Sequence, residues 1–160
     1  MKPGASSSAN DPNPSLESMY KKILVALENG PADETILPHV AELAQHFDSA
    51  LLLLHVADGW AARNFNKFEL AESEEMKADR AYLEATAAVL RARHLAVTTH
   101  LALGNPPTEI LKVAAGENCD LIAMTSHGHR FVGDIVHGST ITQVRHHTNI
   151  PLLILRARKI

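Results

Sequence analysis

The sequence predicts an α/β protein: a single domain built on a doubly wound, Rossmann-like parallel sheet of five strands, with helices on both faces. Three observations lead to this class. Short apolar runs alternate along the chain with longer segments of helical periodicity, which is the pattern of parallel strands joined by helical crossovers. The length of 160 residues suits one compact domain. The only cysteine is Cys119, so a scaffold stapled by intrachain disulfides is excluded.

Residues 1–18 precede the predicted domain, and we expect them to form a disordered N-terminal tail. They contain five Ser, three Pro, two Asn and one Gly, and too few apolar side chains to offset the entropy of ordering. They also lack the apolar stretch of a secretory signal. The folded domain is therefore expected to span residues 19–160.

The first half of the predicted domain holds two strands and two helices. The apolar run at 23–27 is too short for a helix and apolar on both faces, which is typical of a buried strand. Residues 32–47 have apolar side chains at helical spacing, although Pro38 lies inside them and makes the start of this helix uncertain. A second apolar run predicts a strand at 50–56. After a loop without clear periodicity, residues 69–94 are rich in Ala, Glu, Lys and Arg and predict a long helix.

The second half continues the alternation with three strands and two helices. Residues 97–103 alternate between larger apolar and other side chains, which favours a strand. A Gly-Asn-Pro-Pro turn then leads into a helix at 108–116. Apolar runs at 120–125 and 152–155 predict the last two strands, and residues 139–147 predict a short helix between them.

The expected ligand site lies at one edge of this sheet. Doubly wound sheets bind ligands beyond the carboxyl ends of their strands, at the point where the strand order reverses. The loops that follow Leu27, Val56 and Thr125 are therefore the segments in which we look for functional residues.

The segment after the fourth predicted strand has the clearest chemical pattern. Residues 127–138 include three glycines, and Ser139 and Thr140 then open a helix. Glycine lets backbone N–H groups approach a ligand, and a helix N-terminus attracts anions, so this pattern favours phosphate binding. The motifs GxxxxGK(S/T) and GxGxxG are both absent. The alternative, with about equal weight, is that the glycines serve turns and Ser139 caps the helix.

The same segment carries a motif. It contains Met124-Thr125-Ser126-His127-Gly128 and, nine residues later, Gly138-Ser139. This arrangement resembles the C-terminal signature of the universal stress protein family, Gly-x-x-Gly followed after nine residues by Gly-(Ser/Thr). The resemblance extends over nearly the whole of residues 19–160, and the joint order and spacing of its segments make it specific. The other matching segments are Tyr20–Val25, Leu53–Val56, Gly104–Pro106, Glu109–Leu111, Asp120–Met124 and Asn149–Leu155.

The resemblance implies a sheet of the adenine nucleotide alpha-hydrolase type, a homodimer formed through the last strand, Leu152–Leu155, and, in one branch of the family, bound ATP, with or without Mg²⁺. Residues 26, 28 and 56 would lie beside the adenine and the nucleoside, residues 127–128 beside the ribose and α-phosphate, and the N–H groups of 138–140 beside the outer phosphates. The implied contact residues are Ala26, Glu28, Val56, Thr125, His127, Gly128, Gly138, Ser139 and Thr140.

Two of these positions depart from the family pattern. Thr125 stands where the family has the first glycine of its motif, and its side chain would either crowd the ribose or phosphate or donate a hydrogen bond to one of them. Glu28 stands where the family usually has Asp, so its carboxylate reaches about one bond further out. Because Gly128, Gly138 and Ser139 are retained, we favour nucleotide binding.

Composition and spacing exclude several other classes of function. The 18 acidic residues outnumber the 15 basic ones, which argues against a nucleic-acid binder. The longest apolar run is far shorter than a membrane span, so we expect a soluble, cytoplasmic protein. Ten histidines invite a metal hypothesis, but adjacent histidines on a helix do not share a face and no Cys or carboxylate lies at a structural-zinc spacing, so we predict no metal site. His55, at the end of a strand, is expected to be a hydrogen-bonded core residue.

The leading functional hypothesis is therefore an ATP-binding regulatory protein that acts as a homodimer in the stress response, with an unidentified protein partner. One alternative is a non-nucleotide interaction module of the same fold, in which Thr125 closes the site. Another is a slow ATP hydrolase or phosphotransfer protein. Apart from Glu28 and the loop histidines the sequence offers no positioned general base, so we assign no catalytic residue.

Overall fold

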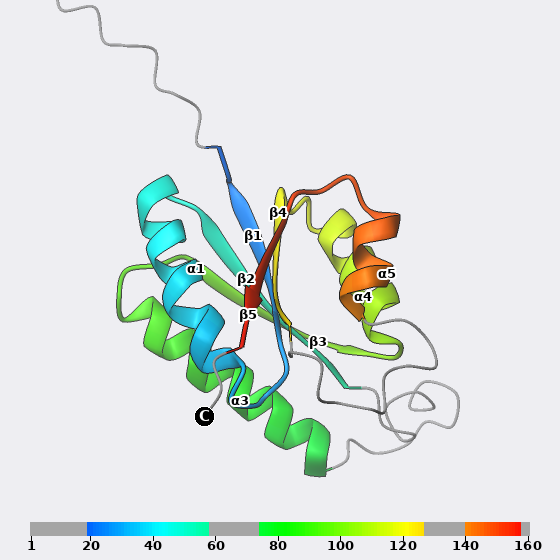
Figure 1. Cartoon of the computed structure of the whole chain (residues 1–160). Coiled ribbons are helices and arrows are strands. Elements are labelled where there is room, and N and C mark those ends of the chain that lie inside the picture. Colours follow the sequence, from blue (N-terminus) through cyan, green and yellow to red (C-terminus); the bar gives the residue numbers. More distant parts are fainter. Residues whose placement is uncertain (1–18, 58–73, 127–139, 158–160) are drawn as a thin grey trace, which may run out of the picture.

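The structure is a computed structural model that describes residues 19–57, 74–126 and 140–157. Strands and helices alternate along these residues (Figure 1). In chain order the elements are β1 (Lys22–Leu27), α1 (Asp33–Phe47), β2 (Ala50–Ala57), α3 (Glu74–Arg91), β3 (Val97–Leu103), α4 (Pro106–Gly116), β4 (Leu121–Ser126), α5 (Thr140–His147) and β5 (Leu152–Arg156).

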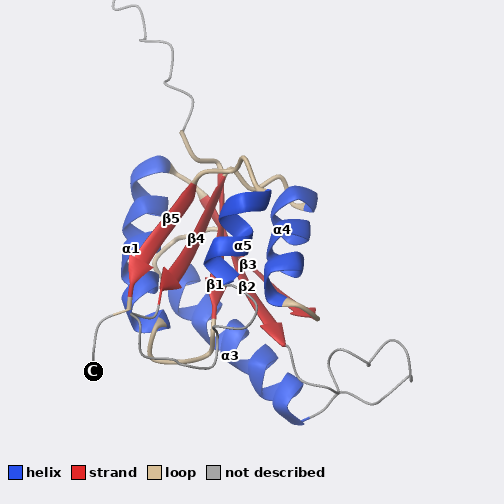
Figure 2. Ribbon diagram, turned by 45° about the vertical axis from the view of Figure 1, so that its right-hand side comes forward, coloured by secondary structure: helices blue, strands red, loops and turns tan. Residues whose placement is uncertain are grey.

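The five strands form one parallel sheet in the order β3-β2-β1-β4-β5. Helices α1 and α3 cover one face of it, and α4 and α5 cover the other (Figure 2). This confirms the doubly wound, five-stranded class that the sequence predicts. The strand order reverses between β1 and β4, because the chain runs outwards from β1 to β3 and then returns to the far side of β1. The carboxyl ends of these two strands are therefore the expected ligand edge.

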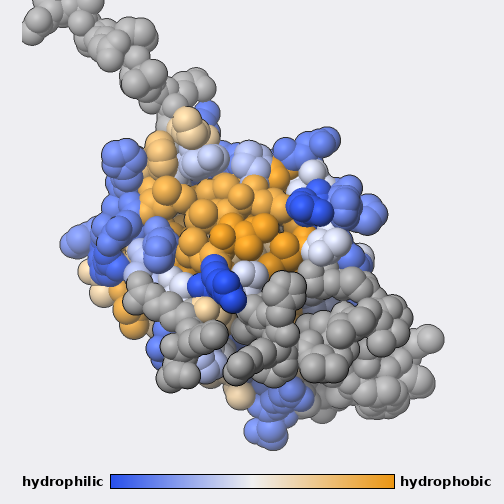
Figure 3. Space-filling model, in the orientation of Figure 1, coloured by the Kyte–Doolittle hydropathy of each residue, from blue (hydrophilic) through white to orange (hydrophobic). Residues whose placement is uncertain are grey.

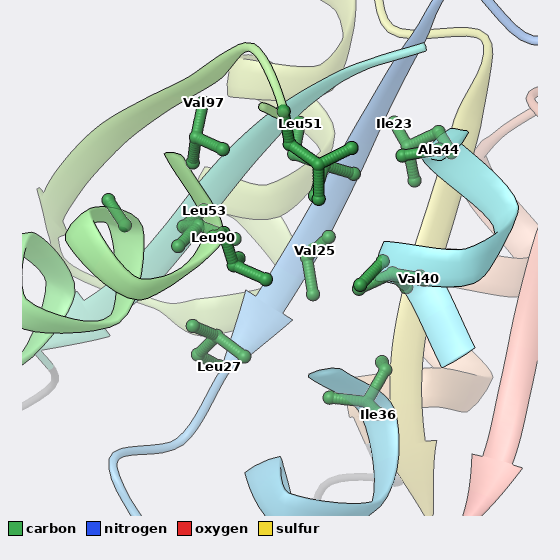
Figure 4. Close-up of a cluster of buried hydrophobic side chains, with 14 of the residues drawn as sticks. Ile23, Val25, Leu27, Ile36, Val40, Ala44, Leu51, Leu53, Leu90 and Val97 are labelled. Atoms are coloured by element: carbon green, nitrogen blue, oxygen red, sulfur yellow. The ribbon is translucent and has the colours of Figure 1, made fainter. Parts of the chain in front are cut away.

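Alternate side chains of the central strands build two hydrophobic layers, because successive residues of a strand point to opposite faces. Ile23 and Val25 of β1 lie on the face covered by α1 and α3, where they pack with Leu51 and Leu53 of β2 (Figure 4). The residue between the first two, Leu24, packs on the opposite face under α4 and α5. Full burial of strand residues on both faces explains why β1 and β2 appear in the sequence as continuous apolar runs.

Helix α1 tolerates a proline in its interior. It begins at Asp33, one residue later than predicted, so that Pro38 lies in its second turn and not in its first. The ring of Pro38 is on the exposed side of the helix, while Ile36 and Val40 on either side of it are fully buried. Burial of that apolar stripe holds the helix together across the position where one backbone hydrogen bond is missing.

Helix α4 begins at Pro106, two residues before the predicted start. Both prolines of the turn belong to the helix, where their missing N–H groups cost nothing in the first turn. Asn105 is the N-cap: its Oδ1 accepts from the backbone N–H of Thr108 at 3.3 Å and from the Thr108 hydroxyl at 2.9 Å. Gly104 precedes the cap with φ of 139°, a backbone conformation that favours glycine.

For two other helices, the prediction can be compared with the structure at one end only. Helix α3 ends at Arg91, before the predicted end at 94, because the chain turns there and His94 has a left-handed φ of 62°. The predicted starts of α3 and α5, at 69–73 and at 139, lie outside the described residues.

Cys119 is 5% exposed in the core under α4 and α5. Burial raises the pKa of its thiol to about 11.

Candidate functional site

Five of the nine predicted contact residues lie among the described residues. Ala26 of β1 and Val56 of β2 are partly buried against the core under α4 and α5, so the structure brings them together on one face of the sheet. Glu28 directly follows β1 and is exposed, and Thr140 begins α5 and is partly exposed. The other four predicted residues lie outside the described residues: His127, Gly128, Gly138 and Ser139.

Thr125 is buried near the end of β4, at the point where the strand order reverses. It is paired in register with Leu155, which packs on the core under α1 and α3. Because paired residues of adjacent strands lie on the same face, the Thr125 side chain is on the opposite face of the sheet from Ala26 and Val56. Its side chain is 5% exposed, and its Oγ1 has no hydrogen-bond partner among the parts of the chain that the structure describes.

The loop between β1 and α1 is organised by one buried carboxylate, that of Asp33. Its Oδ1 accepts from the N–H of Glu28 at 3.0 Å, and its Oδ2 accepts from the N–H of Asn29 at 2.9 Å and of Gly30 at 3.3 Å. Successive N–H groups of this kind form an anion-binding nest. Here the chain's own carboxylate occupies the nest, so these N–H groups are not available to a ligand phosphate.

A phenol from α3 completes the environment of the same carboxylate. The Tyr82 hydroxyl donates to Oδ2 of Asp33 at 2.7 Å, and Asp33 itself is only 2% exposed. Burial raises the pKa of the Tyr82 phenol far above its usual value, and the hydrogen bond to the Asp33 carboxylate raises it further. The phenol therefore remains a hydrogen-bond donor throughout the physiological pH range.

A second buried carboxylate, Asp79 of α3, joins the same loop to the end of β2. Its Oδ1 accepts from the side-chain amide of Asn29 at 2.9 Å, and its Oδ2 lies 3.4 Å from Nε2 of His55. On its other side, Nδ1 of His55 lies 2.8 Å from the carbonyl oxygen of Leu27. The expectation that His55 is a hydrogen-bonded core residue is confirmed.

Sequence reasoning missed this pair of carboxylates and their partners. Asp33 had only the weak signal of an acidic residue in the first turn of a helix, because the N–H groups that it binds belong to the preceding loop. Asp79 did have a signal: it lies three residues after Met76 and four before Leu83, on the apolar stripe of α3, where a buried carboxylate needs polar partners. The partners themselves become visible only in the folded chain.

Metal and membrane hypotheses gain no support from the part of the chain that the structure describes. Within 19–57, 74–126 and 140–157, no three His, Cys, Asp or Glu side chains gather into a group that could hold a metal ion. Nor is any helix in those ranges long and apolar enough to cross a membrane.

The outer edge of β5 carries an apolar surface. β5 is the last strand on its side of the sheet. Ile154 is 40% exposed, and its neighbours on the strand, Leu152, Leu153 and Leu155, are each partly exposed. Figure 3 shows apolar residues gathered in the middle of this face of the molecule, over β5, with polar residues around them. An apolar patch with a polar border is typical of a protein–protein contact.

Comparison with protein-family models gives one match: the model of the universal stress protein family matches residues 19–156. Among curated proteins, the universal stress protein MJ0577 of Methanocaldococcus jannaschii is 27% identical over 162 residues, covering 88% of this chain and 97% of that protein. A second protein of that organism, universal stress protein MJ0531, is 24% identical and covers 89% of this chain and 86% of its own.

Solved structures show the same fold. The structure of MJ0577 superposes with a TM-score of 0.69 at 28% identity, covering 89% of this chain and 99% of that one. A universal stress protein in complex with cAMP has a TM-score of 0.67 at 14% identity, covering 87% and 98% of the two chains. A universal stress protein of Archaeoglobus fulgidus in complex with dAMP has a TM-score of 0.61 at 19% identity, covering 85% and 98%.

Proposed function

Because this chain belongs to the universal stress protein family, we propose that it binds an adenine nucleotide, with ATP as the expected ligand, and acts as a cytoplasmic, homodimeric regulatory protein in the stress response. The observation that carries the proposal is that Ala26 and Val56 lie near the carboxyl ends of the neighbouring strands β1 and β2, next to the reversal of strand order between β1 and β4. Both are partly buried on one face of the sheet, at the edge where doubly wound folds bind ligands. Two proteins of the same fold are complexes with adenine nucleotides, cAMP and dAMP.

In this proposal the adenine, the ribose and one phosphate are assigned to described residues. Ala26 and Val56, both partly buried on one face of the sheet, are the aliphatic contacts of the adenine ring, with the backbone of Val56 reading its edge. Glu28, exposed beyond β1, reaches the ribose hydroxyls. Thr140 opens α5, whose first turn holds no acidic residue and whose N-terminus favours a phosphate.

The remaining phosphate contacts are assigned to residues outside the described ranges. Since Asp33 occupies the N–H groups of the β1–α1 loop, the phosphates have to be held on the other side of the reversal, by the loop that leads into α5. We assign this role to His127, Gly128, Gly138 and Ser139, with Mg²⁺ accompanying the phosphates of ATP.

A thermal-shift and calorimetric titration tests the nucleotide proposal. ATP at 100 times its Kd should raise the free energy of unfolding by about 2.7 kcal/mol, and GTP at the same concentration should raise it less. Gly138→Val should abolish the ATP effect, because the added side chain blocks backbone approach. The control is Gly116→Val at the end of α4, where an added Cβ would meet no atom within 4 Å. If the wild-type protein shows no shift with ATP and Mg²⁺, the proposal is wrong.

The dimer proposal rests on the apolar edge of β5. A second copy placed there would bury Ile154 and the partly exposed leucines around it. Light scattering after size exclusion should give about twice the 17.4 kDa of one chain. Ile154→Glu should yield the monomer, whereas Val89→Glu on α3 should not, although Val89 is more exposed, at 66% against 40%. A dimer that survives Ile154→Glu would place the interface elsewhere.

A further inference from the structure

Asp79 contacts two segments that come from different parts of the sheet edge. Its carboxylate is bound by Asn29, from the loop after β1, and contacts His55, near the end of β2. Each of these partners is adjacent in sequence to a proposed nucleoside contact: Asn29 follows Glu28, and His55 precedes Val56. A single side chain of α3 therefore connects the two backbone segments that would hold the nucleoside.

The imidazole of His55 is held on both sides. The Leu27 carbonyl oxygen can only accept, so Nδ1 of His55 carries a hydrogen and donates it over 2.8 Å. Nε2 then faces Oδ2 of Asp79 at 3.4 Å, with side-chain exposures of 13% and 10%. His55 therefore contacts the end of β1 with one ring nitrogen and α3 with the other.

Asp79 acts on the loop in a different way from Asp33. Asp33 binds backbone N–H groups within the loop and so fixes its internal shape. Asp79 binds the side chain of Asn29, a residue with a left-handed φ of 57°, and thereby ties the loop to another element. Without Asp79 the loop would keep its shape, and β1 would stay paired with β2 through Leu27 and His55, but Asn29 would lose its tie to α3.

We propose that Asp79 is a positioning residue of the nucleotide site: through Asn29 and His55 it holds the segments that carry Glu28 and Val56 against α3. This inference rests on the proposed nucleotide binding. The pairing of Leu27 with His55 already joins β1 to β2. The contribution of Asp79 is to fix the loop after β1, and with it Glu28, relative to α3 and to the end of β2.

The test is a set of ATP dissociation constants measured by calorimetry at one pH. Asp79→Ala removes both ties and should weaken binding about tenfold. Asp79→Asn keeps an oxygen for the side-chain amide of Asn29 and a polar group beside His55, so it should restore most of the wild-type affinity.

Glu75→Gln is the matched control, because it makes the same change of charge on an exposed side chain one turn earlier on α3. It should keep the wild-type affinity. Wild-type affinity in Asp79→Ala overturns the inference, and so does binding by Asp79→Asn that is as weak as that of Asp79→Ala. If Asp79→Ala does not fold, Asn29→Gly decides: it removes the tie between the loop and α3 and suits the left-handed φ at this position, so wild-type affinity in it overturns the inference. A wild-type protein that binds no nucleotide overturns the proposed function as well, whereas binding with unchanged variants overturns this inference alone.

Discussion

Replacement of Asp33 by Ala should destabilise the protein more than any exposed substitution on α1. The carboxylate accepts four hydrogen bonds, from the N–H groups of Glu28, Asn29 and Gly30 and from the Tyr82 hydroxyl, at distances of 2.7–3.3 Å. Hydrogen bonds to a charged group contribute about 1.5–3 kcal/mol each when both partners are buried. The N–H donors belong to residues at or near the surface, where water can replace the carboxylate, so each of these three bonds contributes less.

Taking about 1 kcal/mol for each exposed N–H bond and about 1.5 kcal/mol for the buried phenol bond, Asp33→Ala should lower the free energy of unfolding by about 4.5 kcal/mol. For a chain of this size that is a fall of about 9–18 °C in Tm. Tyr82→Phe, which removes one of the four bonds and leaves no buried donor behind, should cost about 1–2 kcal/mol. Glu34→Ala, the exposed acidic neighbour on α1, should cost about 0.5 kcal/mol.

Urea denaturation followed by circular dichroism at 222 nm measures these differences, provided that the m-value stays constant. The double variant should lose less free energy of unfolding than the sum of the losses in the two single variants. Asp33→Ala already removes the hydrogen bond that Tyr82→Phe would break. A loss below about 1.5 kcal/mol for Asp33→Ala would refute the reasoning, since the N–H bonds of the loop would then contribute nothing measurable.

Three further substitutions and modifications test the local structure. Asn105→Ala should lower the free energy of unfolding by about 1 kcal/mol, because Thr108 loses its capping acceptor; a loss below about 0.3 kcal/mol in urea denaturation would exclude the cap. Gly104→Ala should cost about 1–2 kcal/mol because φ is 139°, even though the added Cβ would meet its nearest neighbour, Glu109 Cγ, only at 3.6 Å; an unchanged Tm would contradict this. With a pKa of about 11, the Cys119 thiol is about 0.1% ionised at pH 8, so a thiol reagent should modify the folded protein at least about 100 times more slowly than the urea-unfolded chain, and equal rates would show that the thiol is accessible.

The fold was predictable because its signals are local. Each strand and each helix can be recognised from the periodicity of apolar residues within a window of about five to twenty residues. The alternation of strands and helices then leaves few possible sheet topologies. The main errors were at boundaries. Pro106 and Pro107 were assigned to a turn, although proline at the first helical position is favourable and a capping asparagine stands directly before them.

The arrangement of the candidate site was only partly predictable. The family resemblance pointed to Ala26 and Val56, which the structure places on one face of the sheet. It could not reveal that Thr125 lies on the opposite face, because that depends on the register between β4 and β5. The contacts of Asp33 with Tyr82 and of Asp79 with Asn29 join residues 49 and 50 positions apart, and no local pattern specifies such pairs.

The central place of β1 in the sheet has a consequence for the order of folding. Ile23 pairs on one side with Leu51 of β2 and on the other with Leu121 of β4. The partner strand on one side of β1 is therefore synthesised early, and the partner on the other side belongs to the last third of the chain. The bond from the Lys21 N–H to Asp120 spans 99 residues. Contacts of such long range slow folding. During translation the apolar β1–α1–β2 unit therefore emerges before β4 can pair with β1, and an unpaired strand edge of this kind favours aggregation of a folding intermediate.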